Sequence, residues 1–339
     1  MFKPRYTLTD ALLANISVIE RLYGQLEAMR IPKELQLNLE RNNLVNSTYI
    51  SNSIEGNPLT LPQVTNLLLG DRVPINRDEK EVRNYFDILK NLDTYSASVL
   101  SLDTVTTIHK RLLIDIKPSI AGVIRNTPVT VGSYYYENGV RKLKVQHQPL
   151  FHKTGEIREQ VNALLQWTEQ SNLPAPLLTG IFHHQFVYIH PFTDGNGRTC
   201  RLLTALLFIQ KHYSINRYFV LDDYYDVDRL QYSEKLHTAD SGDTTTWLEY
   251  FTDGIKFSLQ GALAKAKDAL STISISKQPT PREKDVLKLF QVHQEISSAM
   301  VGVNLRVTRQ QAHKLLHELE QRGFVKKIGS TKSSYYVLV

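Results

Sequence analysis

Apolar residues recur every three or four positions along most of the chain, a spacing that predicts α-helices. Gly56 and Pro58 would end one of the early helices, and Gly70 another. Between residues 129 and 145 the spacing shortens to two, which predicts a β-hairpin turning at Asn138 and Gly139. The predicted fold class is therefore mainly α with a small hairpin. The predicted helices cover residues 10–30, 44–54, 60–69, 78–93, 101–114, 154–171, 177–190, 198–211, 228–240 and a last core segment to about 270.

The pattern changes again near the C-terminus. Residues 271–280 are polar and contain proline, which is typical of a linker. Three helical segments follow, over 281–292, 297–303 and from Thr308 to Arg322, and then two apolar strands over 324–328 and 335–338. This order predicts a winged helix-turn-helix domain. The expected organisation is an N-terminal helical region (1–100), a core (101–270), the linker (271–280) and a second domain (281–339).

Charge and cysteine content narrow the possible environments. Of the net charge of +6, residues 281–339 contribute +5, from ten Lys/Arg against five Asp/Glu, so the rest of the chain is nearly balanced at +1. The single cysteine, Cys200, excludes an internal disulfide framework and fits a reducing compartment. Without an apolar leader or a run long enough to cross a bilayer, the sequence predicts a cytoplasmic protein with no membrane contact.

Candidate chemistry is concentrated between the helices predicted over 177–190 and 198–211. Gly195, Asn196 and Gly197 precede the second helix, whose free N–H groups and positive end favour phosphate. Arg198 and Arg201 lie on one face of its first turn, and Asp194 is a candidate Mg²⁺ ligand. A polyphosphate site is the interpretation, with His190 as a base. A buried, structural histidine is the alternative for His190; His183 and His184 lack zinc spacing and are expected to be structural.

The stretch from His190 to Arg201 resembles the Fic family signature, His-Pro-Phe-x-(Asp/Glu)-Gly-Asn-Gly-Arg-x-x-Arg, at every fixed position. The resemblance implies a Fic-type helical core that transfers AMP from ATP to a Ser, Thr or Tyr hydroxyl of a target protein or of itself. It implies that His190 deprotonates the hydroxyl, that Asp194 binds Mg²⁺ and that Phe192 anchors the loop. The remaining positions would hold ATP: Gly195, Asn196, Gly197 and Arg198 at the α and β phosphates, and Arg201 at the γ phosphate.

A second resemblance precedes the first in the chain. Ser51, Glu55 and Gly56 match the Ser/Thr-x-x-x-Glu-(Gly/Asn) inhibitory motif of Fic proteins, in the helix predicted to end near Ile54. Glu55 would pair with Arg201 and place a negative charge where the γ phosphate of ATP lies. The resemblance leaves two roles open for Glu55, inhibition alone or also the removal of AMP.

The resemblance also suggests more peripheral contacts. The hairpin corresponds to the family's flap, which steers a target by strand addition, with Val129, Thr130, Val131 and Gly132 beside the nucleotide. Residues 146–149 depart from the family's usual double proline, which affects the rim and target choice. Tyr232 is a candidate for stacking on adenine, Asp240 stands where relatives often have an asparagine, and residues 222–225 are expected to form a loop over the site. His109, Lys110 and Arg111 are expected on a solvated helix face.

The C-terminal domain offers a second possible function. Its third helix would present Arg309, Gln310, Gln311 and Lys314 to a major groove, and Lys326, Lys327 and Lys332 would contact the DNA backbone from the wing. A protein-docking or dimerisation role is the alternative, and a homodimer rests on the family resemblance. Two further hypotheses remain for the whole chain: a DNA-binding regulator with a nucleotide-sensing Fic domain, or transfer of another phosphoryl group.

Overall fold

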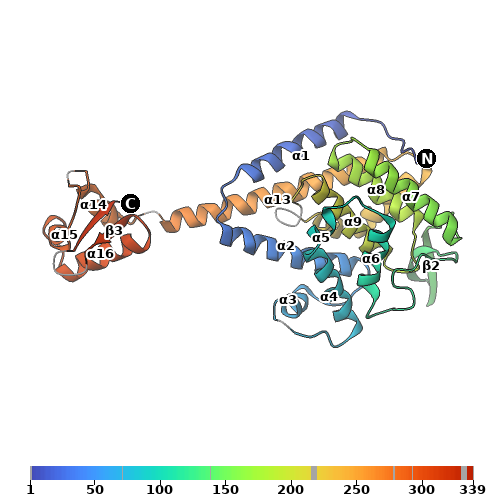
Figure 1. Ribbon diagram of the computed structural model, residues 1–339, viewed down its shortest axis with the longest axis horizontal. Coiled ribbons are helices and arrows are strands. Elements are labelled where there is room, and N and C mark those ends of the chain that lie inside the picture. The colour runs from blue at the N-terminus through green and yellow to red at the C-terminus, as the bar shows by residue number, and fades with distance from the viewer. Residues whose placement is uncertain are drawn as a thin grey trace. The chain divides into compact units, whose positions relative to one another are not determined.

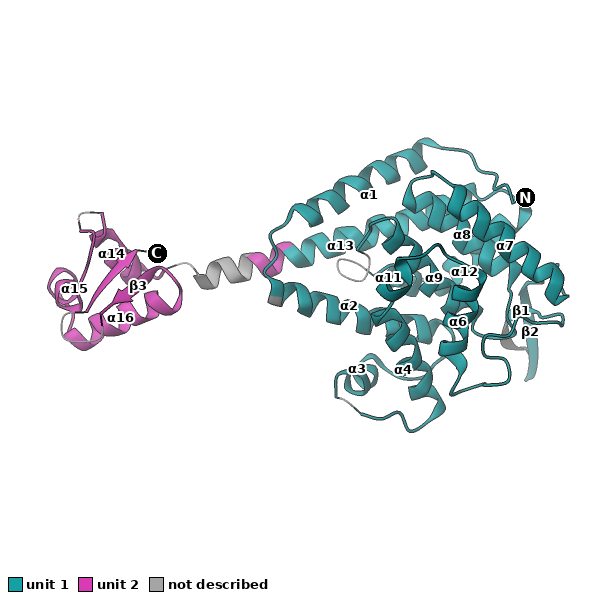
Figure 2. Cartoon of the chain, viewed as in Figure 1, with its two compact units in different colours: residues 1–266 teal, residues 267–339 magenta. Residues whose placement is uncertain are grey.

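The computed structural model describes residues 2–70, 72–137, 139–214, 220–277, 279–291, 293–329 and 334–338. Asn138, the predicted turn residue, and Lys332, a predicted DNA contact, lie outside these ranges. The chain divides into two compact units, Met1–Ala266 and Lys267–Val339 (Figure 2). The boundary falls inside one long helix, α13 (Thr245–Lys277), so the predicted linker is helical as far as Lys277.

Helices form nearly all of the first unit, as the apolar spacing predicts, and the mainly α-helical fold is confirmed (Figure 1). Before the hairpin lie α1 (Asp10–Ala28), α2 (Lys33–Ile54), α3 (Leu61–Leu69), α4 (Arg77–Lys90), α5 (Asp93–Ser96) and α6 (Leu102–Leu113). After it come α7 (Thr154–Gln170), α8 (Ala175–Ile189), α9 (Asn196–Gln210), α11 (Asp222–Val227), α12 (Arg229–Thr238), the short 3₁₀ helix η1 (Ala239–Ser241) and α13.

α8 and α9 form the centre of this unit because they are apolar on almost every face. The two helices pack against each other, and α2, α4 and α6 also contact α9 (Figure 1). Phe182, Phe186 and Leu203 are fully buried between them and their neighbours. Among the described residues, no helix is long and apolar enough to span a membrane.

The N-terminal helices share this core and do not form a region of their own. Leu12 of α1 and Val82 of α4 lie in the same buried cluster as Phe182 of α8. α2 is also longer than its apolar pattern indicates, starting at Lys33 where residue 44 was predicted. The expected N-terminal region (1–100) is therefore packed into the same unit as the expected core.

The predicted hairpin is present as β1 (Val131–Glu137) and β2 (Val140–His147), paired antiparallel. The register shifts between Val131 and Gly132. A Cβ atom at Gly132 would lie 2.3 Å from the carbonyl oxygen of Lys144, so the close approach of the two strands requires glycine here. β2 also contacts α12, where the ring of His147 stacks on that of His237.

The second unit carries its own small core. Its elements after α13 are α14 (Pro281–Leu289), α15 (Ser298–Leu305), α16 (Arg309–Gln321), β3 (Val325–Ile328) and β4 (Tyr335–Leu338). The strands pair antiparallel, and Ile296 bridges to Tyr336 beside them. Thr308 caps α16 in a capping box with Gln311, as its position in the sequence suggests. The core consists of Val286, Ile296, Val301, Ala312, Leu316, Leu319, Val325 and Tyr336.

Candidate active site

The loop between α8 and α9 is held open by two residues in left-handed backbone conformations. His190 caps α8 with φ 51° and ψ 63°, and its N–H donates to the carbonyl oxygen of Phe186. Gly195 precedes α9 with φ 75°. A non-glycine residue with positive φ is uncommon, and such strain is concentrated at functional sites. The loop therefore holds the His190 side chain in one place between two buried helices.

Asn196 braces the loop from inside. Its Oδ1 accepts from the N–H of Phe192 at 2.9 Å, and its Nδ2 donates to the carbonyl oxygen of Phe192 at 2.8 Å. Both residues are buried, with Phe192 fully enclosed. The predicted anchoring role fits Phe192, whereas the side chain of Asn196 is engaged with the loop and leaves only its backbone N–H to face a phosphate.

Two further side chains fix the loop from neighbouring elements. Arg125 donates from Nε to the carbonyl oxygen of His190 at 2.6 Å and from a terminal nitrogen to that of Ile189 at 3.2 Å. His109 stacks on Phe192 with ring centroids 3.6 Å apart and bonds the carbonyl oxygen of Asp194 at 2.9 Å. The prediction of a solvated face was wrong for His109, because the spacing of α6 places it fully inside the core.

The ring of His190 is set up to accept a proton. Its Nδ1 lies 3.2 Å from the carbonyl oxygen of Val187, which only accepts, so Nδ1 carries the hydrogen and Nε2 keeps a free lone pair. Burial lowers the pKa of His190 to about 4. The imidazole is therefore neutral near pH 7 and offers Nε2 as a base.

Asp194 sits at the edge of the same loop and is surrounded by cations. Its Oδ1 accepts from the N–H of Gly195 at 2.6 Å, and Lys117 forms an ion pair with Oδ2. Arg198 approaches Oδ1 to 3.7 Å. Burial would raise the pKa of Asp194, but the Lys117 hydrogen bond and the Arg198 charge outweigh it and lower the pKa. An ionised, partly exposed carboxylate fits a hard divalent cation.

Arg198 has a second carboxylate within reach. Its terminal nitrogen lies 3.3 Å from Oε2 of Glu81, a buried residue of α4. The Arg198 side chain is 4% exposed, and its Nε has no partner among the described residues. Donors that are buried and unpaired cost free energy, which an incoming anion would recover.

Arg201 is held by the end of α2. Its Nε donates to Oγ of Ser51 at 2.7 Å, and one terminal nitrogen donates both to the Ser51 carbonyl oxygen at 2.9 Å and to Oε1 of Glu55 at 2.8 Å. The Arg201 side chain is 2% exposed and that of Glu55 is 30% exposed. Gly56 follows with φ 88°, which ends the helix and turns the chain away.

The carboxylate of Glu55 lies directly over the start of α9. A Cβ atom at Gly197 would be only 2.1 Å from Oε1 of Glu55, and 3.2 Å from a terminal nitrogen of Arg201. Glu55 therefore occupies space beside the glycine backbone where the sequence predicts phosphate. The structure brings together His190, Asp194, Gly197, Arg201 and Glu55, which come from two distant parts of the chain.

A second buried carboxylate, that of Asp222, lines the same small cavity as Arg201. Asp222 accepts from Oγ of Ser47 at 2.9 Å, and burial raises the pKa of Asp222 to about 6 although the Arg201 charge opposes the rise. The expected loop over residues 222–225 is wrong. These residues begin helix α11, where Asp222 and Tyr225 face the core.

The residues predicted to contact the nucleotide at the periphery of the site differ in their exposure. Val129, Val131 and Gly132 are half-buried and Thr130 is exposed, at the start of β1. Tyr232 is 7% exposed, stacks on Tyr225 and shares a hydrogen bond with Nε2 of His183 at 2.9 Å. Stacking of Tyr232 on adenine stays a prediction; in this structure its ring packs in the core and its hydroxyl contacts His183.

Asp240 is engaged by three histidines. Oδ1 lies 3.0 Å from Nε2 of His184, and Oδ2 lies 2.9 Å from Nδ1 of His147 and 3.0 Å from Nδ1 of His237. The expectation that His183 and His184 are structural fits their contacts with Tyr232 and Asp240. Sequence spacing gave no signal for this cluster, since its members come from β2, α8, α12 and η1.

The predicted DNA contacts in the second unit lie on one helix and one strand. Arg309, Gln310, Gln311 and Lys314 are exposed on α16, and Lys326 and Lys327 are exposed on β3. Gln311 also uses its side-chain oxygen to accept from the N–H of Thr308 at 3.0 Å, which caps the helix.

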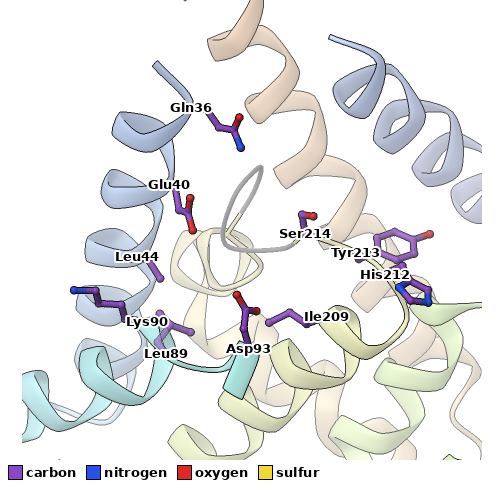
Figure 3. A pocket seen from close by; sticks show the side chains of 10 residues that line it. All are labelled: Gln36, Glu40, Leu44, Leu89, Lys90, Asp93, Ile209, His212, Tyr213 and Ser214. Atoms are coloured by element: carbon purple, nitrogen blue, oxygen red, sulfur yellow. The ribbon is translucent and has the colours of Figure 1, made fainter. Parts of the chain in front are cut away.

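A cavity elsewhere in the first unit does not coincide with these residues. Its wall is drawn in Figure 3 and contains none of the residues that the sequence predicts for a site. It is lined by Gln36, Glu40, Leu44, Leu89, Lys90, Asp93, Ile209, His212, Tyr213 and Ser214.

The region that contains the loop between α8 and α9 is similar to a known protein family. Residues 99–208 match the family model described as the Fic/DOC family. The chain carries a Fic domain. The matched range includes the whole of α8 and all but the last two residues of α9, and with them His190, Asp194 and Arg201.

Named relatives extend the similarity beyond the Fic domain. The chain is 28% identical over 251 residues to the protein adenylyltransferase fic-1 of Caenorhabditis elegans, which covers 70% of this chain and 45% of that protein. It is 28% identical over 214 residues to the protein adenylyltransferase Fic of Nematostella vectensis, covering 60% of this chain and 44% of the relative. The chain thus spans less than half the length of these curated relatives.

Solved structures share the fold. A Fic family protein from Desulfovibrio desulfuricans G20 superposes with a TM-score of 0.67 at 22% identity, covering 100% of this chain and 98% of that one. Fic-1 from C. elegans superposes with a TM-score of 0.60 at 24% identity, covering 74% of this chain and 71% of that one. The arrangement of helices around the Fic domain is therefore one found in known structures.

Proposed function

We propose that the protein is a self-inhibited protein adenylyltransferase, which transfers AMP from ATP to a Ser, Thr or Tyr hydroxyl of a target protein or of itself and releases diphosphate. The observation that carries the proposal is the position of Glu55, bound to Arg201 and lying over Gly197 in the phosphate cradle. The names of the relatives, protein adenylyltransferases, support the reaction.

The reaction follows from the free Nε2 of His190. The target hydroxyl gives its proton to Nε2 while its oxygen attacks the α phosphorus of ATP. The bond from that phosphorus to the bridging oxygen breaks, and diphosphate leaves with the electron pair. The hydrogen bond from Nδ1 to Val187 favours the correct tautomer and steadies the imidazolium that forms.

The phosphates would be held by backbone N–H groups and by arginines. Gly195, Asn196 and Gly197 offer the N-terminal end of α9, and the first turn of that helix carries Arg198, whose Nε has no partner among the described residues. Asp194 would hold Mg²⁺, which neutralises phosphate charge when it is bound. Lys117 now pairs with Asp194, so this lysine must release the carboxylate or share it with the cation.

Inhibition follows from the shared position of Glu55 and the γ phosphate. Both are anions that would pair with Arg201, and two anions do not occupy one desolvated position. Ser51 would hold Arg201 in the same place after Glu55 is removed, because its Oγ accepts from Nε and its carbonyl oxygen accepts from the terminal nitrogen that Glu55 shares. Loss of Glu55 should therefore release an arginine that is already oriented for phosphate.

The test compares wild type, Glu55→Gly, Glu55→Gln and Glu55→Gly/His190→Ala with ATP labelled on the α phosphate, in host lysate and alone. We expect Glu55→Gly to label itself or a lysate protein at least about tenfold faster than wild type, and the double variant to be inactive. Glu55→Gln keeps the size of the side chain but loses its charge, and should fall between wild type and Glu55→Gly.

A γ-labelled control and a chase separate the remaining possibilities. Label from the γ position alone would contradict AMP transfer and would favour transfer of phosphate. If the α label that Glu55→Gly attaches is removed when excess wild type is added, Glu55 also serves in the removal of AMP. If no variant transfers label in lysate or alone, the proposed enzyme activity is wrong.

A second proposal concerns the C-terminal unit, which we infer binds DNA as a winged helix, in two copies of the chain. The exposed Arg309, Gln310 and Lys314 of α16 and the net +5 of residues 281–339 support it. A gel shift with host genomic fragments should weaken steeply with salt, should be lost in Arg309→Ala/Lys314→Ala and should survive in His190→Ala. Retention by the double variant would instead favour a protein-docking role.

A further inference from the structure

The cluster around Asp240 has the arrangement of a metal site. One ligand atom from each of His147, His237 and Asp240 lies within 4.8 Å of the other two. In a tetrahedral zinc site with bonds of about 2.0–2.1 Å, neighbouring ligand atoms are roughly 3.3 Å apart. The present separations from Oδ2 of Asp240 are 2.9 and 3.0 Å, so small adjustments of the side chains would admit an ion between them.

The second ring nitrogen of His147 makes the kind of hydrogen bond that metal-bound histidines commonly make. Nε2 lies 2.9 Å from the carbonyl oxygen of Tyr188, which accepts only, so Nε2 carries a hydrogen. In the neutral ring this leaves the Nδ1 lone pair pointing toward Asp240. A histidine ligand that donates its other N–H to a backbone carbonyl is the common arrangement at metal centres.

The aspartate is oriented in the same manner. His184 contacts Oδ1 of Asp240 at 3.0 Å, and this leaves Oδ2 facing the Nδ1 atoms of His147 and His237. His184 is 5% exposed and His147 is 4% exposed, whereas His237 and Asp240 are 17% and 24% exposed. The site is therefore fixed on its inner side and open on its outer side, where water would complete the coordination.

The alternative without an ion requires more charge in the same space. If both nitrogens of His147 donate, to Tyr188 and to Asp240, the ring is an imidazolium. One dication bound to Asp240 would supply the same neutralisation while leaving both imidazoles neutral. A bound ion would thus pair Asp240 with neutral histidines, and Tyr188 and His184 already orient His147 and Asp240 for it.

We propose that His147, His237 and Asp240 bind a divalent transition metal of the Zn²⁺ type, which joins the C-terminal end of β2 to α12 and η1. Two imidazole nitrogens and one carboxylate oxygen suit Zn²⁺ and disfavour Mg²⁺, which prefers oxygen. His147 pairs with Val131 in the hairpin register, so the ion would fix the base of the hairpin. This site is separate from the proposed Mg²⁺ ligand Asp194, and its existence does not depend on AMP transfer.

The test measures Zn²⁺ binding to the full chain by calorimetry, after chelator treatment and dialysis at about pH 7.5. We expect one site of micromolar affinity or tighter, weakened at least about tenfold in His237→Ala and in Asp240→Asn. His152→Ala removes an exposed histidine outside the cluster and should bind as wild type does. Co²⁺ should give the visible absorption of a tetrahedral or five-coordinate site in wild type and lose it in both cluster variants.

Three outcomes would overturn the proposal. If wild type takes up no Zn²⁺ under these conditions, the cluster is not a metal site. Binding that is unchanged in His237→Ala and Asp240→Asn would place the ion elsewhere. Binding that Mg²⁺ displaces at equal concentration would indicate an oxygen site. Far-ultraviolet circular dichroism of each variant separates loss of the site from loss of the fold.

Discussion

The charge states of single side chains in the candidate active site depend on burial and on the charges of their neighbours. His190 is enclosed between α8 and its capping loop, and its pKa falls to about 4 because the charged ring would lose water. Asp194, a few residues later, keeps its charge because Lys117 and Arg198 compensate for the burial. Two ionisable groups in one loop thus differ in charge state at neutral pH because their neighbours differ.

The titration of His190 is the first prediction. In the nucleotide-free protein the ring should take up its proton near pH 4, so the folded state keeps it neutral at pH 5 to 8. Histidine ring resonances followed by NMR, with the His190→Ala spectrum for assignment, measure this directly. A midpoint close to 6.5 would contradict the burial argument, and would make the base partly protonated at neutral pH.

The elements position these residues through contacts that are easy to disrupt. The loop depends on Asn196, whose side chain satisfies both backbone groups of the buried Phe192. The C-terminal end of α2 is held by Ser51 and Glu55, which lie one helix turn apart and both accept hydrogen bonds from Arg201. The contact between Glu55 and Arg201 therefore depends on where α2 ends.

Replacing Asn196 by Ala is the second prediction. The change leaves one buried N–H and one buried carbonyl of Phe192 without partners, which should lower the free energy of unfolding by about 2–4 kcal/mol. Urea denaturation measures the loss. Asn91→Ala is the control, since the Asn91 side chain donates to Asp87 at an exposed position and its loss should cost less than about 1 kcal/mol. Equal losses in the two variants would contradict the bracing role of Asn196.

Contiguous motifs were the part of the site that could be predicted. His190 to Arg201 is one run of residues, and Ser51 to Gly56 another, so their chemistry is legible before folding. Lys117, Asp222 and the histidines around Asp240 are each unremarkable in sequence, and only packing brings them to their partners. His109 was misplaced because one polar residue on α6 gives no sign that its ring lies against Phe192.

At the scale of the whole molecule, the first unit has one core that encloses several titratable groups. Burial lowers the pKa of His109 and His190 to about 4 and that of His183 to about 3. The unfolded chain takes up these protons near pH 6.5, whereas the folded chain does not. Stability contributed by the neutral rings is therefore present above pH 6.5 and is lost as the pH falls toward 4.

The third prediction is this pH dependence. Each of the three histidines should lower the free energy of unfolding by about 1.4 kcal/mol per pH unit between roughly pH 6 and 4.5, and the raised pKa of Asp222, about 6, should partly offset the loss. Trp167 and Trp247 both lie in the first unit, so their fluorescence during urea unfolding reports on that unit. His183→Gln should flatten the slope; unchanged stability down to pH 4.5 would contradict it.

The contact of Glu55 with Arg201 has a kinetic consequence. Under the proposed self-inhibition, the Glu55 carboxylate would act as a tethered competitor of ATP, present at a fixed effective concentration that the length and order of α2 determine. Competition of this kind raises the apparent KM for ATP and leaves kcat unchanged at saturation. The ATP concentration needed for activity would then depend on the stability of the last turn of α2. Any change that loosens the end of α2 would lower that concentration.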